Sequence, residues 1–264
     1  MFYKLLCIFL ITVCSALAQA DEKHSILSRI KGAGEVKVCI WPGYYAITYR
    51  NPKTSELSGI DIDMAKELAS YLDVRLNFVE SSFAHLIDNL KTYKCDIAMH
   101  GVGVRESRKK HMLFSKPYLS SGIYAIANKK ENIIKKWSDI DQHGVVVVVQ
   151  RGTYMEPVMR QELKKADLSV VDSFKAREQA VLSGRADVFM TDYPYGKRMQ
   201  KLTKWAELHS PPNVLAPTNY AYAVPKGQKK WLITVDSFLE EMKSSGRLSE
   251  YADRHGLTEI VISK

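Results

Sequence analysis

The sequence predicts an α/β protein with two βαβ lobes joined by a two-segment hinge. Three features of the 264-residue chain predict this fold: strand and helix patterns alternate, the alternation occurs twice, and an extended segment follows each unit. With 46% hydrophobic and 25% charged residues, the composition is that of an ordinary globular protein. The chain has no internal repeat at a fixed period, which argues against a repeat array.

The first alternating unit has three predicted strands and two predicted helices. The strands are expected over residues 36–41, 75–79 and 96–100. One helix is expected over residues 60–72, where apolar side chains recur every four positions. The second helix should begin near Ser82, which can cap it, and Phe83 falls on its apolar stripe. Two helical crossovers between three strands imply a parallel sheet.

The second unit repeats this order. Its strands are expected over residues 145–150, 169–172 and 186–191. The first of them is a β-branched run, typical of a strand buried on both faces. Gly152 and Thr153 begin a helix in which Thr153 and Glu156 fit a capping box. A second helix, over residues 176–182, ends at Gly184.

Extended segments at residues 122–127 and 219–224 connect the two units. The tail over residues 231–255 is predicted to be helical, with a break at Gly246, and we expect it to pack on the first lobe. The predicted organisation is residues 21–124 as the first part of lobe 1, residues 125–218 as lobe 2, and residues 219–264 as a return strand with C-terminal helices. A cleft between two such lobes is the expected ligand site.

Residues 1–20 have the pattern of a signal peptide cleaved after Ala20. Lys4 is their only charge, and the apolar run after it is shorter than the about 20 residues that span a bilayer. Ala18 and Ala20 are small residues at the positions that a signal peptidase reads. An uncleaved anchor, or a lipoprotein cysteine at Cys14, is the alternative. We expect a soluble mature chain in the periplasm.

Two cysteines, Cys39 and Cys95, remain after cleavage. An exported location permits a disulfide between them. Both fall in predicted strands, at unequal offsets, so we expect two buried thiols rather than a bridge.

The chain is basic, and loss of Lys4 with the signal lowers its formal net charge from +9 to +8. The Lys and Arg residues are spread along the chain, often beside acids, which is typical of a solvated surface. We therefore expect no nucleic-acid partner.

Four stretches resemble, in this order, motifs of the type II periplasmic solute-binding proteins, specifically extracellular solute-binding protein family 3. They begin at Gly59 (GIDIDMAKEL), Arg108 (RKKHMLFSKPY), Gln150 (QRGTY) and Gly184 (GRADVFMTD). The resemblance covers nearly the whole mature chain. It implies the type II fold, capture of a small amino-acid-like ligand, and an inner-membrane ABC permease as partner. We expect a monomer without a cofactor.

The resemblance implies that Arg108 grips a ligand carboxylate and that Asp192 holds a ligand ammonium group. A planar guanidinium offers two donors that match a carboxylate. The residues fall on different lobes, so a zwitterion would favour closure. A surface ion pair for Arg108 and a helix cap for Asp192 are the alternatives. Thr153, at a helix start, can bind the same carboxylate or simply cap the helix.

The resemblance also assigns aromatic residues to the ligand pocket: Trp41, Tyr44 and Phe83, with Tyr154 and Tyr193 as further candidates. Core packing is the alternative for these rings, above all for Phe83, which fits the predicted helix stripe.

The chain departs from the family pattern at the ligand site. Gly101 and Gly103 stand where the family usually has Ser or Thr, so only backbone groups remain there for the ligand. Trp41 stands where some binders of basic amino acids have an acid. This argues against a lysine, arginine or histidine ligand and for an apolar or aromatic one, and a ligand other than an α-amino acid stays open.

Two alternative functions share this fold. Cyclohexadienyl dehydratases need a carboxylic acid that protonates a leaving hydroxyl. A Glu is expected shortly after Asp192, but Tyr193-Pro194-Tyr195-Gly196 follows, and capping explains Glu156. An accessory protein of a periplasmic quinoprotein dehydrogenase is the other alternative. The seven histidines lack metal-ligand spacing, so we expect neither catalytic residues nor a metal.

Overall fold

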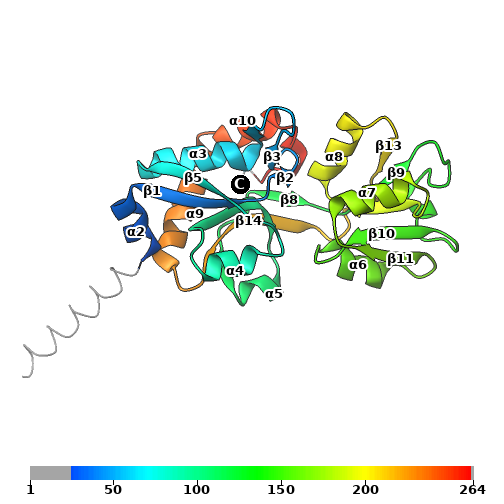
Figure 1. The fold of residues 1–264 in the computed structure, drawn as a ribbon, viewed down its shortest axis with the longest axis horizontal. Coiled ribbons are helices and arrows are strands. Elements are labelled where there is room, and N and C mark those ends of the chain that lie inside the picture. The colour runs from blue at the N-terminus through cyan, green and yellow to red at the C-terminus, as the bar shows by residue number, and fades with distance from the viewer. Residues whose placement is uncertain (1–24, 263–264) are drawn as a thin grey trace, which may run out of the picture.

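The computed structural model describes residues 25–262, which form two mixed β-sheets side by side along the long axis of the molecule (Figure 1). The strands of the first sheet, in spatial order, are β5 (Arg75–Glu80), β1 (Glu35–Ile40), β6 (Ile97–Gly103), β14 (Thr218–Pro225) and β7 (Met112–Phe114), and β8 (Leu119–Ser121) also pairs with β14. β5, β1 and β6 are parallel, as predicted. β14 runs antiparallel between β6 and β7. The first sheet therefore contains strands that precede the second sheet in the sequence and one strand, β14, that follows it.

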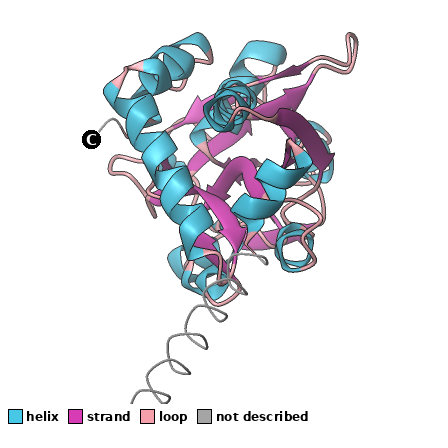
Figure 2. Ribbon diagram, turned by 90° about the vertical axis from the view of Figure 1, so that its left-hand side faces the viewer, coloured by secondary structure: helices cyan, strands magenta, loops and turns pink. Residues whose placement is uncertain are grey.

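The first sheet and its helices form the first lobe. These helices are α2 (Ile26–Ala33), α3 (Ile60–Leu72), α4 (Leu86–Lys91), α5 (Glu106–Lys109), α9 (Lys229–Ser244) and α10 (Arg247–Arg254), with a 3-10 turn, η2 (Thr258–Ile260). In Figure 2, which views this lobe end-on, helices lie on both sides of the strands. α9 contacts α2, α3 and β7, so the C-terminal tail packs on the first lobe.

α3 has the bounds that the sequence predicts. The helix starts after Gly59, whose φ is +131°, and a Cβ there would lie 2.3 Å from the Ile47 carbonyl oxygen. Only glycine fits that position. The apolar stripe of α3 is buried against the first sheet and α9, which anchors the main core of the lobe.

The helix predicted to begin at Ser82 is shorter than expected, because α4 begins only at Leu86. Ser82 Oγ accepts from the His85 N–H at 3.3 Å and so shapes a turn rather than a helix start. Phe83 therefore lies in this turn. The expectation that it packs on a helix stripe is wrong.

Cys39 and Cys95 form a disulfide, with 5.6 Å between their Cα atoms. The prediction of two free thiols is wrong because β6 begins at Ile97, two residues later than Cys95. Cys95 therefore lies in the turn before β6. Its position cannot be compared with that of Cys39 by counting residues along two paired strands.

The second sheet has the strand order β11 (Asp167–Val171), β10 (Val146–Gln150), β12 (Val188–Thr191), β9 (Tyr124–Asn128) and β13 (Ala206–His209). The first three strands are parallel, and β9 is antiparallel to β12. This sheet forms the second lobe with η1 (Trp137–Asp139), α6 (Met155–Glu162), α7 (Phe174–Leu182) and α8 (Tyr193–Leu202). The two-lobed α/β fold predicted from the sequence is confirmed.

The chain passes between the lobes twice. β8 ends at Ser121 in the first sheet and β9 begins at Tyr124 in the second. The return runs from β13, which ends at His209, to β14, which begins at Thr218. A small sheet of β2 (Gly43–Tyr44), β3 (Thr48–Arg50) and β4 (Leu57–Ser58) lies at the first lobe. Among residues 25–262, no helix has the length and apolar character required to cross a bilayer.

Candidate functional site

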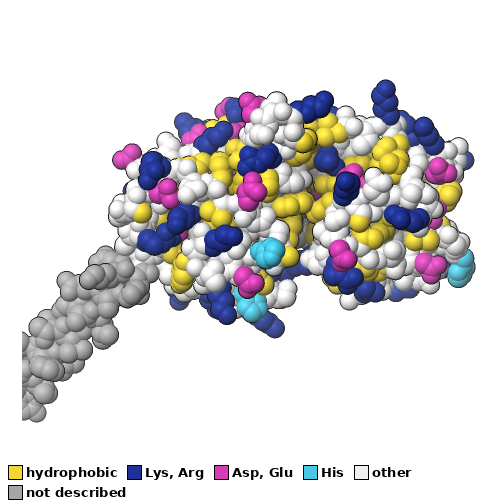
Figure 3. Space-filling model, in the orientation of Figure 1, with side chains coloured by type: hydrophobic (Ala, Val, Ile, Leu, Met, Phe, Trp, Pro, Cys, Tyr) yellow, Lys and Arg dark blue, Asp and Glu magenta, His cyan; other side chains and the backbone are white. Residues whose placement is uncertain are grey.

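A cavity of about 480 Å³, part of it open to solvent, lies between the two lobes. On the face drawn in Figure 3, apolar side chains gather along the boundary between the lobes, while Lys and Arg side chains are scattered over both. Eight of the residues predicted from the sequence line the cavity: Tyr44, Phe83, Gly101, Gly103, Arg108, Thr153, Tyr154 and Asp192. The lining also includes Gly152, which the sequence places in the same turn as Thr153. The other lining residues were not predicted from the sequence: Arg105, Met155, Phe174, Thr191 and Tyr220.

Asp192 follows β12, caps the next helix as the sequence analysis considered, and also contacts two tyrosines of the first lobe. Its Oδ1 accepts from the Tyr195 N–H at 3.1 Å, which caps α8. Its Oδ2 accepts from the hydroxyl of Tyr44 and, at 2.9 Å, from the hydroxyl of Tyr220. Burial first, and then the Asp192 charge, raise the pKa of both tyrosines, so both hydroxyls stay protonated donors. Tyr44 and Tyr220 belong to the first lobe, so this carboxylate joins the lobes.

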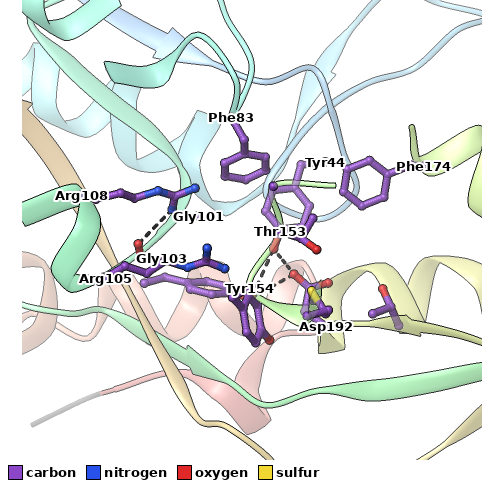
Figure 4. Close-up of a pocket in the computed structure, with 14 residues that line it drawn as sticks. Tyr44, Phe83, Gly101, Gly103, Arg105, Arg108, Thr153, Tyr154, Phe174 and Asp192 are labelled. Carbon is purple, nitrogen blue, oxygen red and sulfur yellow. Dashed lines mark hydrogen bonds between the residues drawn. The ribbon is translucent and has the colours of Figure 1, made fainter. Parts of the chain in front are cut away.

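Arg108 lies near the end of α5, on the opposite side of the cavity from Asp192 (Figure 4). One guanidinium nitrogen donates to the Gly103 carbonyl oxygen at 3.0 Å, and the group lies 5.7 Å from the centre of the Phe83 ring. Burial and, next, the charge of Arg105 lower the pKa of Arg108 to about 10, which leaves it protonated at neutral pH. Arg108 has no ion pair with any residue that the structure describes. The alternative role considered for it, a surface ion pair, is therefore not observed.

Arg105 is the cap residue before α5 and was not identified from the sequence. Its guanidinium points into the cavity, 5.4 Å from the centre of the Tyr154 ring (Figure 4). Burial lowers its pKa. The sequence did contain a signal for Arg105, its spacing of three residues from Arg108. Residues three apart share one face of a helical turn, so Arg105 could be expected beside Arg108.

Gly101 and Gly103, at the end of β6, bring the backbone close to the cavity. Gly101 has a φ of +61°, and a Cβ there would lie 2.8 Å from the Tyr44 ring. The Gly101 N–H donates to Asp61 Oδ2 at 2.8 Å, which fixes the end of the strand. A serine at position 101 would displace Tyr44 and, with it, a contact to Asp192.

The aromatic wall draws on both lobes. Phe83 and Tyr44 line the cavity from the first lobe, and Phe174, at the start of α7, lines it from the second (Figure 4). Trp41 is not among the lining residues. Its ring instead packs on three aromatic residues that line the cavity, with centroid distances of 5.5 Å to Tyr44, 5.5 Å to Phe83 and 4.7 Å to Phe174. The stack on Phe174 is a second contact between the lobes.

Tyr154 and Tyr193, the further aromatic candidates, differ in position. The Tyr154 hydroxyl donates to the Gly122 carbonyl oxygen at 2.9 Å, and its ring lines the cavity. Tyr193 lies outside the cavity: its N–H donates to Ser121 Oγ at 3.0 Å, and its ring packs on Tyr124.

The capping box predicted for Thr153 and Glu156 does not form. Thr153 Oγ1 donates to the Gln150 carbonyl oxygen at 2.7 Å, because α6 begins only at Met155 and Thr153 still belongs to the turn. Glu156 accepts from the Gly152 N–H at 3.2 Å instead and pairs with Arg160 at 3.0 Å. Thr153 lines the cavity from this turn.

Two buried polar atoms at the site have no partner within residues 25–262. Thr191 Oγ1 lies at the cavity wall, and His100 Nε2 lies below Phe83, whose ring centre is 5.2 Å from the imidazole. Burial lowers the pKa of His100 to about 4, so it is neutral. A buried hydroxyl without a partner at a cavity wall suits a polar ligand atom. In the same part of the chain, no group of three or more His, Cys, Asp or Glu side chains could hold a metal ion.

These lobes, crossings and interlobe cavity define a type II periplasmic binding protein. Residues 36–258 match the family model of bacterial extracellular solute-binding proteins, family 3, and the chain belongs to this family.

Similar proteins include binding proteins and one enzyme. Cyclohexadienyl dehydratase of Pseudomonas aeruginosa is 30% identical over 90% of this chain and 88% of its own. The L-cystine-binding protein TcyJ of Escherichia coli is 26% identical over 93% of this chain and 90% of its own. Most of the similar curated proteins are named as binding proteins.

Solved structures show the same fold. The ancestral amino acid-binding protein AncCDT-1, a precursor of cyclohexadienyl dehydratase, superposes with a TM-score of 0.78 at 30% identity, covering 87% of this chain and 99% of that one. A mutant of the arginine-binding protein of T. maritima gives 0.75 at 26% identity, covering 86% and 97%.

Proposed function

We propose that this protein is the periplasmic substrate-binding component of an ABC-type importer and captures a small amino-acid-like ligand between its lobes. In this proposal it is exported by a signal peptide cleaved after Ala20 and delivers its ligand to an inner-membrane permease. The observation that carries the proposal is the pair of opposite charges across the cavity, Arg108 on one lobe and Asp192 on the other. Family membership supports it.

We propose a hinge mechanism for capture, in which residues 21–124 with 219–264 move against residues 125–218. Ligand binds one lobe first, and the second lobe then closes on it. The contacts of Tyr44 with Asp192 and of Trp41 with Phe174 cross the cleft and would favour the closed form. A zwitterionic ligand adds charge-assisted bonds to both lobes, and so favours closure further.

Arg108→Ala tests the ligand assignment. We expect it to abolish binding, because the variant loses the charge-assisted bonds to the ligand carboxylate, which contribute on the order of 1.5–3 kcal/mol each. The mature protein is first screened by thermal shift against amino acids and small organic acids, since bound ligand raises the melting temperature. Each hit is then titrated by calorimetry into wild type and variant. Equal affinity in the two proteins would show the assignment to be wrong.

A dehydratase is the second candidate, favoured by the 30% identical relative. Asp192 is the only carboxylic acid among the described cavity-lining residues, and three donors already hold it. A general acid must deliver its proton to the leaving group, and no other carboxyl group of residues 25–262 lines the cavity for this step. We expect no aromatic product when the protein is incubated with prephenate or arogenate. Steady turnover of either compound would replace the binding-protein proposal.

A further inference from the structure

The cavity carries more positive than negative charge. Arg105, Arg108 and Asp192 are its charged lining residues within the described part of the chain, two cations against one anion. His100 beneath the wall is neutral because burial lowers its pKa. A neutral zwitterionic amino acid would leave this excess positive charge in place, and a cationic ligand would increase it.

Neither guanidinium is neutralised by an acidic side chain within residues 25–262. The Arg108 guanidinium donates only to a backbone carbonyl, and the Arg105 guanidinium makes no hydrogen bond or ion pair with any of the described residues. The two cations are close enough for the charge of Arg105 to lower the pKa of Arg108. Two adjacent, partly buried cations without a paired acid are electrostatically unfavourable, and a bound anion reduces this cost.

The acceptor capacity of Asp192 is largely used. Tyr44, Tyr220 and the Tyr195 N–H already donate to its two oxygens. A carboxylate has about four acceptor positions, so at most one further donor fits. Recognition of the ligand therefore depends more on the two guanidiniums than on the carboxylate.

We infer that Arg105 and Arg108 together form a two-guanidinium anion subsite, and that the ligand carries two acidic groups rather than the single carboxylate of a neutral amino acid. The inference rests on the proposed ligand-binding function and narrows its ligand class to small dicarboxylates. An amino group on the ligand would use the remaining acceptor position of Asp192 and bring the charge of the complex to zero. Arg105 is the residue that determines specificity for the second acidic group.

The test is calorimetric titration of matched acid and amide pairs, L-aspartate with L-asparagine and L-glutamate with L-glutamine. In wild type we expect the acid of at least one pair to bind 10-fold or more tightly than its amide. Arg105→Gln removes one charged partner and should weaken binding of that acid by about 10- to 100-fold, with the affinity for the amide nearly unchanged. 2-Oxoglutarate, which lacks the amine, shows whether the second acidic group is recognised without an ammonium. L-Arginine should not bind.

Two controls separate specificity from structure. Lys109 lies four residues after Arg105, and its side chain is exposed and outside the cavity. Lys109→Gln removes the same charge and should leave every affinity unchanged. Without ligand, Arg105→Gln should melt at the wild-type temperature or above, because it removes an uncompensated cation. A structural role for Arg105 would instead lower the melting temperature.

Three results would overturn the inference: an amide that binds as tightly as its acid in each pair, an undiminished acid preference in Arg105→Gln, or no binding by any of these acids. If neutral amino acids bind with an affinity that depends on Arg108 but not on Arg105, the proposed function stands and the inference falls. If no compound in the wider screen binds, both fall.

Discussion

Asp192 shows how one side chain can hold an element and a site at once. One oxygen caps α8, and the other accepts hydrogen bonds from two tyrosine hydroxyls of the opposite lobe. The sequence offered the cap as the alternative to a ligand contact, and it gave no sign of the two tyrosine contacts. The cap does not exclude the proposed ligand contact, because a carboxylate has two oxygens that can face different partners.

Asp192→Asn separates these roles. The amide oxygen can keep the cap on the Tyr195 N–H, while the side chain loses the negative charge that would attract a ligand ammonium. We expect affinity for amine-bearing ligands to fall by about 1.5–3 kcal/mol, the contribution of a charge-assisted bond, while ligands without an amine change little. Calorimetry with such a pair of ligands measures the difference. An equal loss for both would mean that Asp192 acts through the shape of the cavity.

At the scale of elements, Asp61 joins α3 to three strands or strand ends of the first lobe. Its Oδ2 accepts from the Gly101 N–H at 2.8 Å and from the Tyr118 hydroxyl at 2.6 Å, and its Oδ1 accepts from the Tyr222 hydroxyl at 3.3 Å. The side chain is fully buried. Gly101 lines the cavity, so this junction fixes the backbone on which the site depends.

Asp61 makes the stability of the protein depend on pH. Burial raises its pKa from 3.8 to about 7, so between these values the folded state binds more protons than the unfolded state. The stabilising contribution is complete below pH 3.8 and is lost as pH rises through about 7. Relative to Asp61→Asn, wild type should lose roughly 2–3 kcal/mol of unfolding free energy between pH 5 and 8. Urea unfolding of both proteins measures this difference, and parallel pH profiles would contradict it.

At the scale of the whole molecule, two kinds of contact hold the chain in its two-lobed form. Within the first lobe, the disulfide between Cys39 and Cys95 links residues 56 positions apart. Between the lobes, the hydroxyl contacts of Asp192 and the Trp41–Phe174 stack are noncovalent and small. The first lobe is therefore cross-linked covalently, whereas the noncovalent contacts between the lobes can open, as the proposed capture by closure requires.

The disulfide should contribute substantially to the stability of the whole chain. Closing a loop of this length in the unfolded state corresponds to about 4 kcal/mol in the chain-entropy model. We expect Cys39→Ala/Cys95→Ala, and wild type under reducing conditions, to unfold at a correspondingly lower urea concentration. A reductant that shifts wild type but not the double variant would attribute the loss to the bridge. An unchanged midpoint in all samples would show that the bridge does not stabilise the fold.

The sequence by itself determined the lobes, the parallel order of the strands and most of the residues around the cavity. These features follow from local periodicity and from motifs that are contiguous in the chain, such as the one that ends at Asp192. α3 was predicted with its observed bounds because its apolar stripe is a local signal.

Only the tertiary structure decided the disulfide, the place of Phe83 and the charge balance of the cavity. Cys95 and Phe83 lie in turns whose backbone is set by packing between distant strands, not by the pattern of neighbouring residues. Arg105 adds an unpaired charge to the cavity because none of the described acids pairs with it, although the chain contains many acids that could have done so. Periodicity specifies which face of an element is buried, whereas the partners of a charge depend on how the elements meet.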